Sequence, residues 1–484
     1  MTIAKIILKN EVACNINGLD LDTRKKLSEK YSFFVPHARY SPSYRLGRWD
    51  GKINFFSIGG STYNNLLEEI VPDLIQSGYE VDIEDNRVAA SIGTLEPVER
   101  DTFAHIIWPE GHPFEGKPVE LHDHQINAIN QYLENPQCIQ ELSTSAGKTI
   151  ITAALSQRIE KYGRSIVIVP NKSLVEQTLA DYQNFELDVG VYYGDRKDLD
   201  KTHTICTWQS LESLERQKRD EKRSDAVEEF VSGVCCVIVD EVHGADAAAL
   251  KRLLSGPMAN IPLRWGLTGT IPKDQGSQMS IKVNLGPIVN KVKASDLQEL
   301  GILSSCNINV LQTQENIVYN NYQSELSFLV TDPVRLDWMA EKIKEISYSG
   351  NTLVLVDRIK TGEELVARIQ DSVFVSGEVK QKKRKEEYKD INLGEGKVLV
   401  ATFGVAAVGI SITRLHNVVL VEPGKSFVRV IQSIGRGLRK GFDKDHVDIW
   451  DICANAKYSK KHLTERKRFY SDAEYPFTIK KIYR

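Results

Sequence analysis

Seven consecutive residues have the composition of a phosphate-binding loop: Ser143, Thr144, Ser145, Ala146, Gly147, Lys148 and Thr149. They follow a short apolar run, residues 138–142, and precede an Ala- and Ile-rich stretch with helical periodicity. Such a turn gathers backbone N–H groups at the positive end of a helix dipole, where a phosphate is favoured. Lys148 is then expected to reach the β- and γ-phosphates of a nucleoside triphosphate, and the Thr149 hydroxyl to ligate Mg²⁺. The first glycine of the common GxxxxGK[ST] pattern is replaced by Leu142.

Two adjacent carboxylates, Asp240 and Glu241, follow a second apolar run at residues 235–239. If this run is a strand, both carboxylates emerge at its carboxyl end, which is where open α/β sheets bind ligands. Hydrolysis of a phosphoanhydride uses one carboxylate to hold the metal ion and another to orient the attacking water. Asp240 is therefore the candidate metal ligand, and Glu241 is the candidate for water activation.

The elements that must position these residues are visible as an alternation of Val/Ile runs and helical stretches from residue 119 onward. The runs at 165–169, 204–207, 235–239 and 263–267 are almost continuously apolar, which is typical of parallel strands buried on both faces. A second series contains the runs 352–356, 373–375, 397–401, 417–421 and 447–451. The pattern predicts an α/β fold with two parallel-sheet domains in tandem, at residues 118–303 and 304–455.

The remaining segments flank these two domains. Residues 1–95 are expected to form a small α/β module, with strands at 3–8, 12–16 and 53–58 and a helix at about 22–30 that Asp22 or Thr23 caps. Residues 96–117 are rich in Pro and Gly, which predicts a linker or a covering loop. Residues 456–484 combine an excess of Lys and Arg with several aromatic residues, which predicts a basic C-terminal extension able to face a polyanion.

The N-terminal segment Gly47–Lys52 places Arg48, Trp49 and Lys52 in a glycine-bounded turn. Interleaved cations and aromatic rings can hold phosphates and stack on bases. The same residues also suit a hairpin whose tryptophan packs into the core while its charges are solvated. The composition alone leaves both interpretations open.

The composition narrows the class of protein. The chain has 484 residues and a net charge of −3, so any nucleic-acid surface must be local. Its seven cysteines are scattered without a CxxC pair, which argues against a disulfide framework and a structural zinc site. No apolar run is long enough to span a membrane. We expect a soluble protein of the cytoplasm, with a monomer favoured although the sequence does not specify an oligomeric state.

Residues 119–452 resemble the superfamily 2 helicases and translocases, since they carry that family's motifs in order. Gln125 is similar to the adenine-reading Gln motif, and residues 143–149 to motif I. Asp240-Glu241-Val242-His243 resembles a DExH-type motif II. Thr268-Gly269-Thr270 resembles motif III, which in the family couples hydrolysis to movement. The resemblance implies two RecA-like domains, ATP and Mg²⁺ as cofactors, and nucleotide contacts from Gln125 and His243.

The same resemblance implies where nucleic acid is held, through motifs Ia, Ic, IV, IVa and V. The residues expected to contact phosphate and sugar are Pro170, Asn171, Thr207, Gln209, Arg358, Ser376, Gly377 and Thr402. In motif V, Gly409 is expected at the nucleotide. Gln432, Arg436 and Arg439 match the QxxGRxxR of motif VI. Both arginines are thereby implied to be arginine fingers, and a spacing of three residues places them on one helix face.

Three segments narrow the resemblance to UvsW-type phage helicases: residues 141–149, the Gly409-Ile410-Ser411 end of motif V, and Gly47–Lys52. This family is associated with branched DNA, including junction migration, fork regression and R-loop unwinding. Ser145 stands where glycine is commoner in the superfamily, and Ser411 where motif V often has aspartate. The resemblance favours nucleic-acid contacts for Arg48, Trp49 and Lys52, and implies sequence-independent binding of branched or forked DNA in the host cytoplasm.

Three alternative functions remain open at this stage. The first is the motor of a restriction-type nuclease complex, although residues 1–95 and 456–484 show no convincing carboxylate cluster for a nuclease. The second is an RNA helicase, because the motifs do not separate RNA from DNA. The third is an ATP-switched clamp that remodels protein on DNA without unwinding the duplex.

Overall fold

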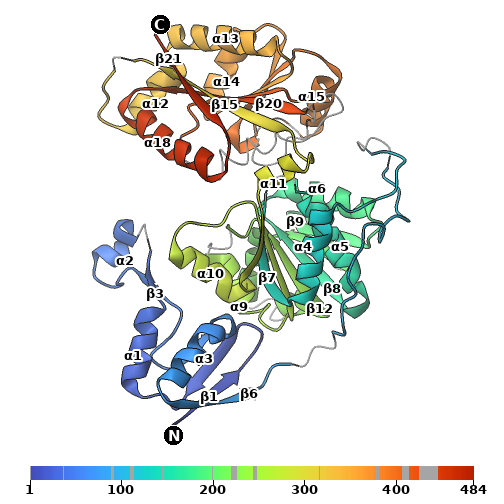
Figure 1. Ribbon diagram of the computed structural model, residues 1–484, viewed down its shortest axis with the longest axis vertical. Helices are drawn as coiled ribbons and strands as arrows, with labels where there is room; N and C mark the ends of the chain where they lie inside the picture. The colour runs from blue at the N-terminus through green and yellow to red at the C-terminus, as the bar shows by residue number, and fades with distance from the viewer. Residues whose placement is uncertain are drawn as a thin grey trace. The chain divides into compact units, whose positions relative to one another are not determined.

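The computed structural model describes residues 2–35, 38–88, 92–109, 114–143, 146–198, 200–219, 226–243, 248–315, 317–377, 379, 381–405, 412, 414–424 and 445–483. The chain forms two compact units (Figure 1). The first comprises Met1–Leu142 and Gly147–Lys291, and the second comprises Ser143–Ala146 and Val292–Arg484.

The first unit begins with a small four-stranded sheet in the order β5-β2-β1-β6. Its strands are β1 Thr2–Leu8, β2 Ala13–Asn17, β5 Ser61–Tyr63 and β6 Tyr79–Asp85. Its helices are α1 Leu21–Lys30 and α3 Leu67–Gln76, preceded by the short η2 Asn64–Leu66. Leu27 and Leu74 from the two helices share a buried core with Ile6 and Ile16. The expected cap, Asp22 or Thr23, is wrong: the Asp20 carboxylate accepts the Thr23 N–H and caps α1, so the helix begins at Leu21.

A two-stranded ribbon, β3 Ser32–Phe34 with β4 Lys52–Asn54, extends from this sheet. It carries the short helices η1 Ala38–Tyr40 and α2 Pro42–Arg45. The strand expected over residues 53–58 was predicted too long. After Asn54 the backbone leaves the ribbon, and the side chains of Phe55 and Phe56 enter the core of the four-stranded sheet.

The described residues between β6 and α4 Asp123–Glu134 form a covering segment rather than an open tether. Phe103 is fully buried and Trp108 nearly so, and both rings meet Phe185 edge-on, with centroids 5.5 Å and 6.2 Å away. The Arg158 guanidinium holds the start of this segment through the Glu96 and Pro97 carbonyl groups. The segment therefore packs on the parallel-sheet part of the first unit.

The main sheet of the first unit has eight strands in the order β10-β9-β11-β8-β12-β13-β7-β14. The strands are β7 Gln137–Leu142, β8 Arg164–Val169, β9 Val189–Tyr193, β10 Arg196–Lys197, β11 His203–Thr207, β12 Val234–Asp240, β13 Leu263–Thr268 and β14 Ile288–Val292. Pairing from β9 through β7 is parallel throughout. The four apolar runs predicted to be strands are thus confirmed as β8, β11, β12 and β13.

Helices cover both faces of this sheet, as Figure 1 shows for α4 and α5 on one side and α9 and α10 on the other. The helices are α4 Asp123–Glu134, α5 Lys148–Ile159, η3 Glu160–Tyr162, α6 Lys172–Asn184, α7 Trp208–Arg219, α8 Ala226–Val231, α9 Ala248–Ser255 and α10 Gln275–Leu285. This two-sided cover explains the nearly continuous apolar strands, since neither face meets water.

The second unit contains a seven-stranded sheet in the order β17-β18-β16-β19-β20-β15-β21, with all pairs parallel. The strands are β15 Ser305–Thr313, β16 Thr352–Val356, β17 Ser372–Val375, β18 Val398–Thr402, β19 Asn417–Val421, β20 His446–Ala454 and β21 Phe477–Ile482. The helices are α11 Ala294–Glu299, α12 Tyr322–Thr331, α13 Pro333–Ser347, α14 Ile359–Val366, α15 Gln381–Leu393 and α18 Lys457–Asp472. The predicted tandem α/β fold is confirmed.

Residues 456–483, which the sequence sets apart as a basic extension, lie within the second unit's fold. Strand β21 pairs in parallel with β15 at the edge of the sheet. Arg466 of α18 is fully buried and forms a two-bond ion pair with Asp451, at 2.8 and 2.9 Å. The Glu325 carboxylate accepts the N–H groups of Tyr458 and Ser459 and so caps α18. Arg466 thus stabilises the fold and cannot face a polyanion.

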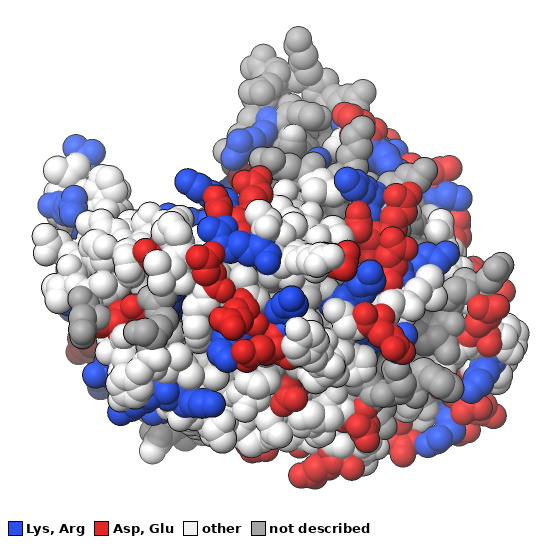
Figure 2. Space-filling view, turned by 90° about the horizontal axis from the view of Figure 1, so that it is seen from above, with Lys and Arg blue, Asp and Glu red and all other residues white. Residues whose placement is uncertain are grey.

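Charged side chains of both signs are mixed on the surface, and the thiol groups are buried. Lys and Arg side chains are scattered among Asp and Glu side chains on the face shown in Figure 2. All seven cysteines are reduced and buried. No helix among the described residues has both the length and the apolar character needed to cross a bilayer.

Candidate nucleotide site and nucleic-acid groove

The phosphate loop ends on a glycine in the left-handed region. Gly147 has φ +80° and stands at the N-cap of α5. A Cβ at this position would lie 2.2 Å from the Nε2 of Gln125, so the position also requires a residue without a side chain. Gln125 is buried and its Oε1 accepts the His122 N–H, which fixes the amide against the loop. The structure therefore brings the predicted Gln motif to the start of α5.

The ammonium group of Lys148 lies 3.0 Å from the Glu241 carboxylate, and both side chains are largely buried. The other oxygen of Glu241 lies 3.3 Å from the Nδ1 of His243 and accepts a 3.4 Å hydrogen bond from Thr268 Oγ1. Thr268 Oγ1 also lies 3.1 Å from the same His243 nitrogen. Residues from the predicted motifs I, II and III thus form one hydrogen-bonded cluster.

Backbone strain and burial distinguish the two carboxylates. Glu241 has φ +55°. This left-handed conformation is unfavourable for any residue other than glycine, and it is found most often at functional sites. Burial alone would raise the pKa of Glu241, but the Lys148 charge and the hydrogen bond with His243 outweigh it and hold the pKa below its usual value. Burial raises the pKa of Asp240 to about 6, with Lys148 opposing the shift. The environment therefore keeps Glu241 ionised and leaves Asp240 poised to gain a cationic ligand.

These residues fit a nucleoside triphosphate with its metal ion. The first turn of α5 presents backbone N–H groups that have no acceptor within the helix. The left-handed Gly147 leaves an approach to them that a Cβ would fill, and Lys148 supplies a positive charge beside them. Thr149 and Asp240 carry the oxygen donors that suit Mg²⁺. Six of the expected nucleotide-site residues lie outside the described part of the chain: Thr144, Ser145, Gly409, Gln432, Arg436 and Arg439.

Four of the residues expected to contact nucleic acid line one hollow of about 460 Å³ at the carboxyl ends of β8 and β11. These are Pro170, Asn171, Thr207 and Gln209. Asn171 also caps α6 by accepting the Leu174 N–H, and the hydroxyl groups of Thr207 and Ser210 are 2.9 Å apart. The local structure therefore fixes these side chains at the rim of the hollow, which we call the rim groove.

Sequence reasoning missed other residues of the rim groove, including Lys172, Tyr192, Gly194 and Lys197. Tyr192 and Lys197 come from the antiparallel pair β9–β10, and the Lys197 ammonium lies 5.9 Å from the Tyr192 ring centroid. The dipeptide Gly194-Asp195 directly after two β-prone tyrosines is a hairpin signal that would have revealed this pair. Together they add positive charge and an aromatic ring to the groove.

In the second unit, three expected contacts follow the carboxyl ends of adjacent parallel strands. Arg358 follows β16 and begins α14, Ser376 follows β17, and Thr402 is the last residue of β18. Because β17, β18 and β16 are neighbours, these residues share one edge of the sheet. Ser376 is buried, whereas Gly377 beside it is exposed.

The N-terminal turn has features of both earlier interpretations. Arg48 and Lys52 are exposed, while Trp49 is half-buried. The indole N–H of Trp49 donates to the Lys52 carbonyl at 2.8 Å, and the Asp50 carboxylate accepts the Lys52 N–H. Trp49 therefore holds the turn together while the two cationic side chains face outward.

Known proteins share both parallel-sheet domains. The family profile described as "Type III restriction enzyme, res subunit" matches residues 118–273, and "Helicase conserved C-terminal domain" matches residues 335–441. The ATP-dependent DNA helicase uvsW of Enterobacteria phage T4 is 27% identical over 498 residues, covering 95% of this chain and 96% of the relative. Putative helicase 22 of a Sulfolobus islandicus filamentous virus is 24% identical, covering 73% and 67%. The structure of S. cerevisiae Dbp5 bound to RNA and ADP BeF3 has the same fold, with a TM-score of 0.54 at 14% identity over 75% of this chain and 90% of that chain.

The class of protein follows from three observations: two RecA-like domains, the Lys148–Glu241 pair at the expected phosphate loop, and these relatives. The chain is a superfamily 2 helicase, and hence a nucleic-acid-stimulated ATPase. Within that superfamily it is related to UvsW of phage T4.

Proposed function

We propose that the chain is an ATP- and Mg²⁺-dependent DNA motor that acts on branched or forked DNA in the host cytoplasm. The observation that carries the motor is the Glu241 cluster, in which one carboxylate contacts both Lys148 at the phosphate loop and Thr268 of motif III. The similarity to UvsW over nearly the whole chain supports DNA as the substrate. Junction migration, fork regression and R-loop unwinding are the branched-DNA reactions that we expect.

The geometry suggests a role for each residue. Thr149 and Asp240 would hold Mg²⁺, which would supply charge neutralisation at the phosphates. Lys148 would leave Glu241 for the β- and γ-phosphates when ATP binds, which frees the carboxylate to orient water. Thr268, Gly269 and Thr270 would transmit this exchange, because Thr268 Oγ1 contacts both Glu241 and the Thr270 backbone. Gln432, Arg436 and Arg439 would stabilise charge on the γ-phosphate, and Gln125, His243 and Gly409 would complete the nucleotide contacts.

DNA would be held mainly through its backbone. In the rim groove, Asn171, Thr207 and Gln209 offer polar groups at a strand edge, and Lys172 and Lys197 add charge. Arg358, Ser376, Gly377 and Thr402 would do the same in the second unit, while Arg48, Trp49 and Lys52 would contact DNA from the N-terminal turn. Because these groups lie at strand edges and suit phosphate and sugar, we expect binding to be sequence-independent.

The test is the ATPase rate of the full chain without nucleic acid and with single-stranded DNA, linear duplex, a four-way junction or RNA. Strongest stimulation by the junction, together with exchange of its arms, is the expected result. Equal rates on linear and branched DNA would refute the branched substrate. Stimulation by RNA alone would favour an RNA helicase, ATP-dependent cleavage of DNA would favour a nuclease-coupled motor, and stimulation without strand exchange would favour a clamp.

A further inference from the structure

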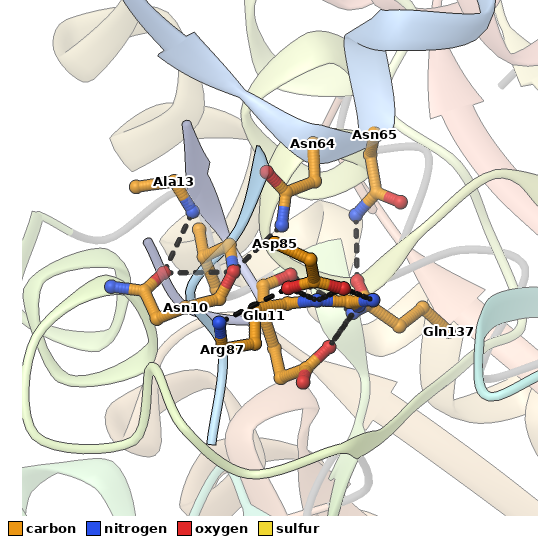
Figure 3. Close-up of polar contacts among 9 residues, drawn as sticks. Asn10, Glu11, Ala13, Asn64, Asn65, Asp85, Arg87 and Gln137 are labelled. Atoms are coloured by element: carbon orange, nitrogen blue, oxygen red, sulfur yellow. Dashed lines mark hydrogen bonds and ion pairs between the residues drawn. The ribbon is translucent and has the colours of Figure 1, made fainter. Parts of the chain in front are cut away.

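The side-chain amide of Gln137 joins the small N-terminal sheet to the motor sheet from both of its ends. Its Oε1 accepts a 2.9 Å hydrogen bond from Asn65, and its Nε2 donates a 2.9 Å hydrogen bond to the Glu11 carbonyl (Figure 3). Asn65 also donates to the Val283 carbonyl at 3.4 Å. Gln137 belongs to the motor sheet, whereas Asn65 and Glu11 belong to the four-stranded sheet region, which we call the N-terminal module (residues 2–88).

The loop that carries Glu11 is built to present its backbone to Gln137. The Asn10 side chain accepts the N–H groups of Val12 and Ala13, which closes a tight turn between β1 and β2. Asn64 donates to the Asn10 carbonyl at 2.7 Å. The Glu11 N–H is then directed to the Ala259 carbonyl of the motor domain, 2.9 Å away. Both backbone groups of Glu11 are therefore used to dock the module.

Apolar and charged contacts reinforce this attachment. Val283 of α10 is fully buried within the module's own hydrophobic core. Next to it, Lys282 pairs with Glu69 of α3. The Lys251 ammonium of α9 lies 4.8 Å from the ring centroid of Phe55. A core shared between the two parts favours motion as one body over motion about a hinge.

A carboxylate of the module also acts on a buried charge in the motor sheet. Arg264 is fully buried and donates to the carbonyl groups of Leu254, Met258 and Asn284. Burial lowers the pKa of Arg264 to about 10, and Glu11 is the strongest of the charges that oppose this shift. The Glu11 carboxylate is itself nearly buried and pairs with Arg87 at 3.0 Å. The module thus contributes a negative charge that favours the charged form of Arg264.

Gln137 is also the first residue of β7, the strand that leads into the phosphate loop. Strand β7 is held in register by parallel pairing with β13 from Gln137 to Glu141. A strand of this length spans roughly 20 Å and transmits displacement with little bending because neighbouring strands pair along it. Strand β7 thus runs from the module's attachment point to Leu142, five residues before Gly147 in the chain.

We propose that Gln137 is a positioning residue that couples the N-terminal module to the nucleotide site through β7. This inference rests on the proposed function, since it concerns how work reaches DNA held by the module. With the amide in place, the module and the ATP-binding sheet move as one body, so a nucleotide-driven displacement moves the DNA. Without it, the remaining contacts hold the module less firmly at the start of β7, so ATP is still hydrolysed but part of each stroke is lost.

The variant Gln137→Met removes both amide hydrogen bonds while keeping an unbranched side chain of similar length. Asn130→Leu is the matched control, because the Asn130 amide also makes two hydrogen bonds, to the backbone of Val98 in the covering segment. The full-length variants are compared for junction-stimulated ATPase, for junction movement per ATP hydrolysed, and for amide hydrogen exchange in residues 10–13 and 61–66.

Gln137→Met is expected to keep its ATPase within about two-fold, to lose exchange protection in the module loop, and to move the junction about five-fold less per ATP. Asn130→Leu should leave the movement per ATP unchanged. Unchanged movement per ATP in Gln137→Met would overturn the inference, and so would retained exchange protection. If Gln137→Met does not fold, Asn65→Leu removes the Oε1 bond from the module side. A wild-type chain without DNA-stimulated ATPase would refute the proposed function, whereas the exchange data would still test the docking.

Discussion

Glu241 combines a left-handed backbone with side-chain contacts to Lys148, His243 and Thr268. A left-handed glutamate persists only where its surroundings hold it. The unfavourable backbone conformation of Glu241 indicates that the position of its carboxylate is important for function. The hydrogen bonds around it link the nucleotide site to motif III.

Replacing Glu241 with glutamine should abolish turnover but spare nucleotide binding. The amide keeps the shape of the side chain yet cannot activate water, so the nucleic-acid-stimulated kcat is expected to fall by about 10²–10⁴. Steady-state ATPase and equilibrium binding of a fluorescent ATP analogue measure the two effects. Glu141→Gln is the control, since Glu141 lies near the end of β7, which β13 separates from β12, and pairs with Lys291. Weak nucleotide binding by Glu241→Gln would contradict the assignment.

Gly147 should tolerate no side chain. Gly147→Ala places a methyl group 2.2 Å from Gln125 Nε2 and puts an alanine in a left-handed backbone conformation. Nucleotide binding is therefore expected to fall at least ten-fold. Gly78→Ala is the control, because Gly78 has φ +86° with no atom near its Cβ position. It should cost only the backbone strain, about 1–2 kcal/mol, and leave the ATPase intact. Equal binding defects in the two variants would show that strain, not the contact, is responsible.

His203 makes the stability of the first unit depend on pH. It is fully buried on β11, and burial lowers its pKa to about 4 from an ordinary value of 6.5. Above pH 6.5 the imidazole is neutral in both the folded and the unfolded protein, so the full stability is present. As the pH falls toward 4, the unfolded chain takes up the proton first, and about 3 kcal/mol of the free energy of unfolding is lost. The free energy of unfolding should therefore drop in this range.

His203→Gln, compared with wild type by urea unfolding at pH 7 and pH 4.5, measures that contribution. The variant should lose stability at pH 7, because Ser165 loses its 2.8 Å partner, but should show a smaller decrease on acidification. An identical decrease in both proteins would contradict the assignment to His203.

At the scale of elements, the rim groove depends on the β9–β10 hairpin as much as on the helix starts. Lys172→Ala and Lys197→Ala should each weaken DNA binding irrespective of sequence. Each loss should lower the slope of log affinity against log salt by about 0.7–0.9, the value for one phosphate contact. Titrations at several salt concentrations measure this slope. Lys342→Ala, on α13 and paired with Glu345, is the control and should leave it unchanged.

The strands that sequence could predict are those buried on both faces. Cys235–Val239 is apolar at every position and Thr352–Val356 at every position after the first, and both were found within one residue of their expected bounds. Asp240 and Glu241 could be placed for the same reason, since a strand end determines where they emerge. The contact between Lys148 and Glu241 was not predicted, since it depends on which strands become neighbours in the sheet.

Other strands carried no such signal. Strand β15 reads SCNINVLQT and alternates polar with apolar residues, while β21 contains two lysines and was assigned to a basic tail. Lysines on an edge strand also prevent unwanted pairing, so their presence does not argue against a strand. The burial of Arg466 depends on its ion pair with Asp451. The two residues lie on different elements and become adjacent only after folding. Long-range pairs of this kind leave no local trace.

At the scale of the whole molecule, every thiol is shielded. Burial raises the pKa of all seven cysteines, to about 11 for Cys235 and Cys306. Because the thiolate is the reactive species, the folded protein should react with a thiol reagent orders of magnitude more slowly than the chain in denaturant, where all seven react. Spectrophotometric titration with Ellman's reagent measures both. Rapid reaction of one or more thiols in the folded protein would contradict this.

Buried thiols also make the natural chain a ready background for site-specific labelling. A cysteine introduced at exposed Gln76 in the first unit and another at exposed Glu341 in the second would be the two reactive positions, so dyes could be attached without replacing any native cysteine. Energy transfer between such a pair would report the distance between the two units in real time. The opening and closing that a motor of this superfamily requires could then be followed in single molecules, with the core packing of the wild-type protein left intact.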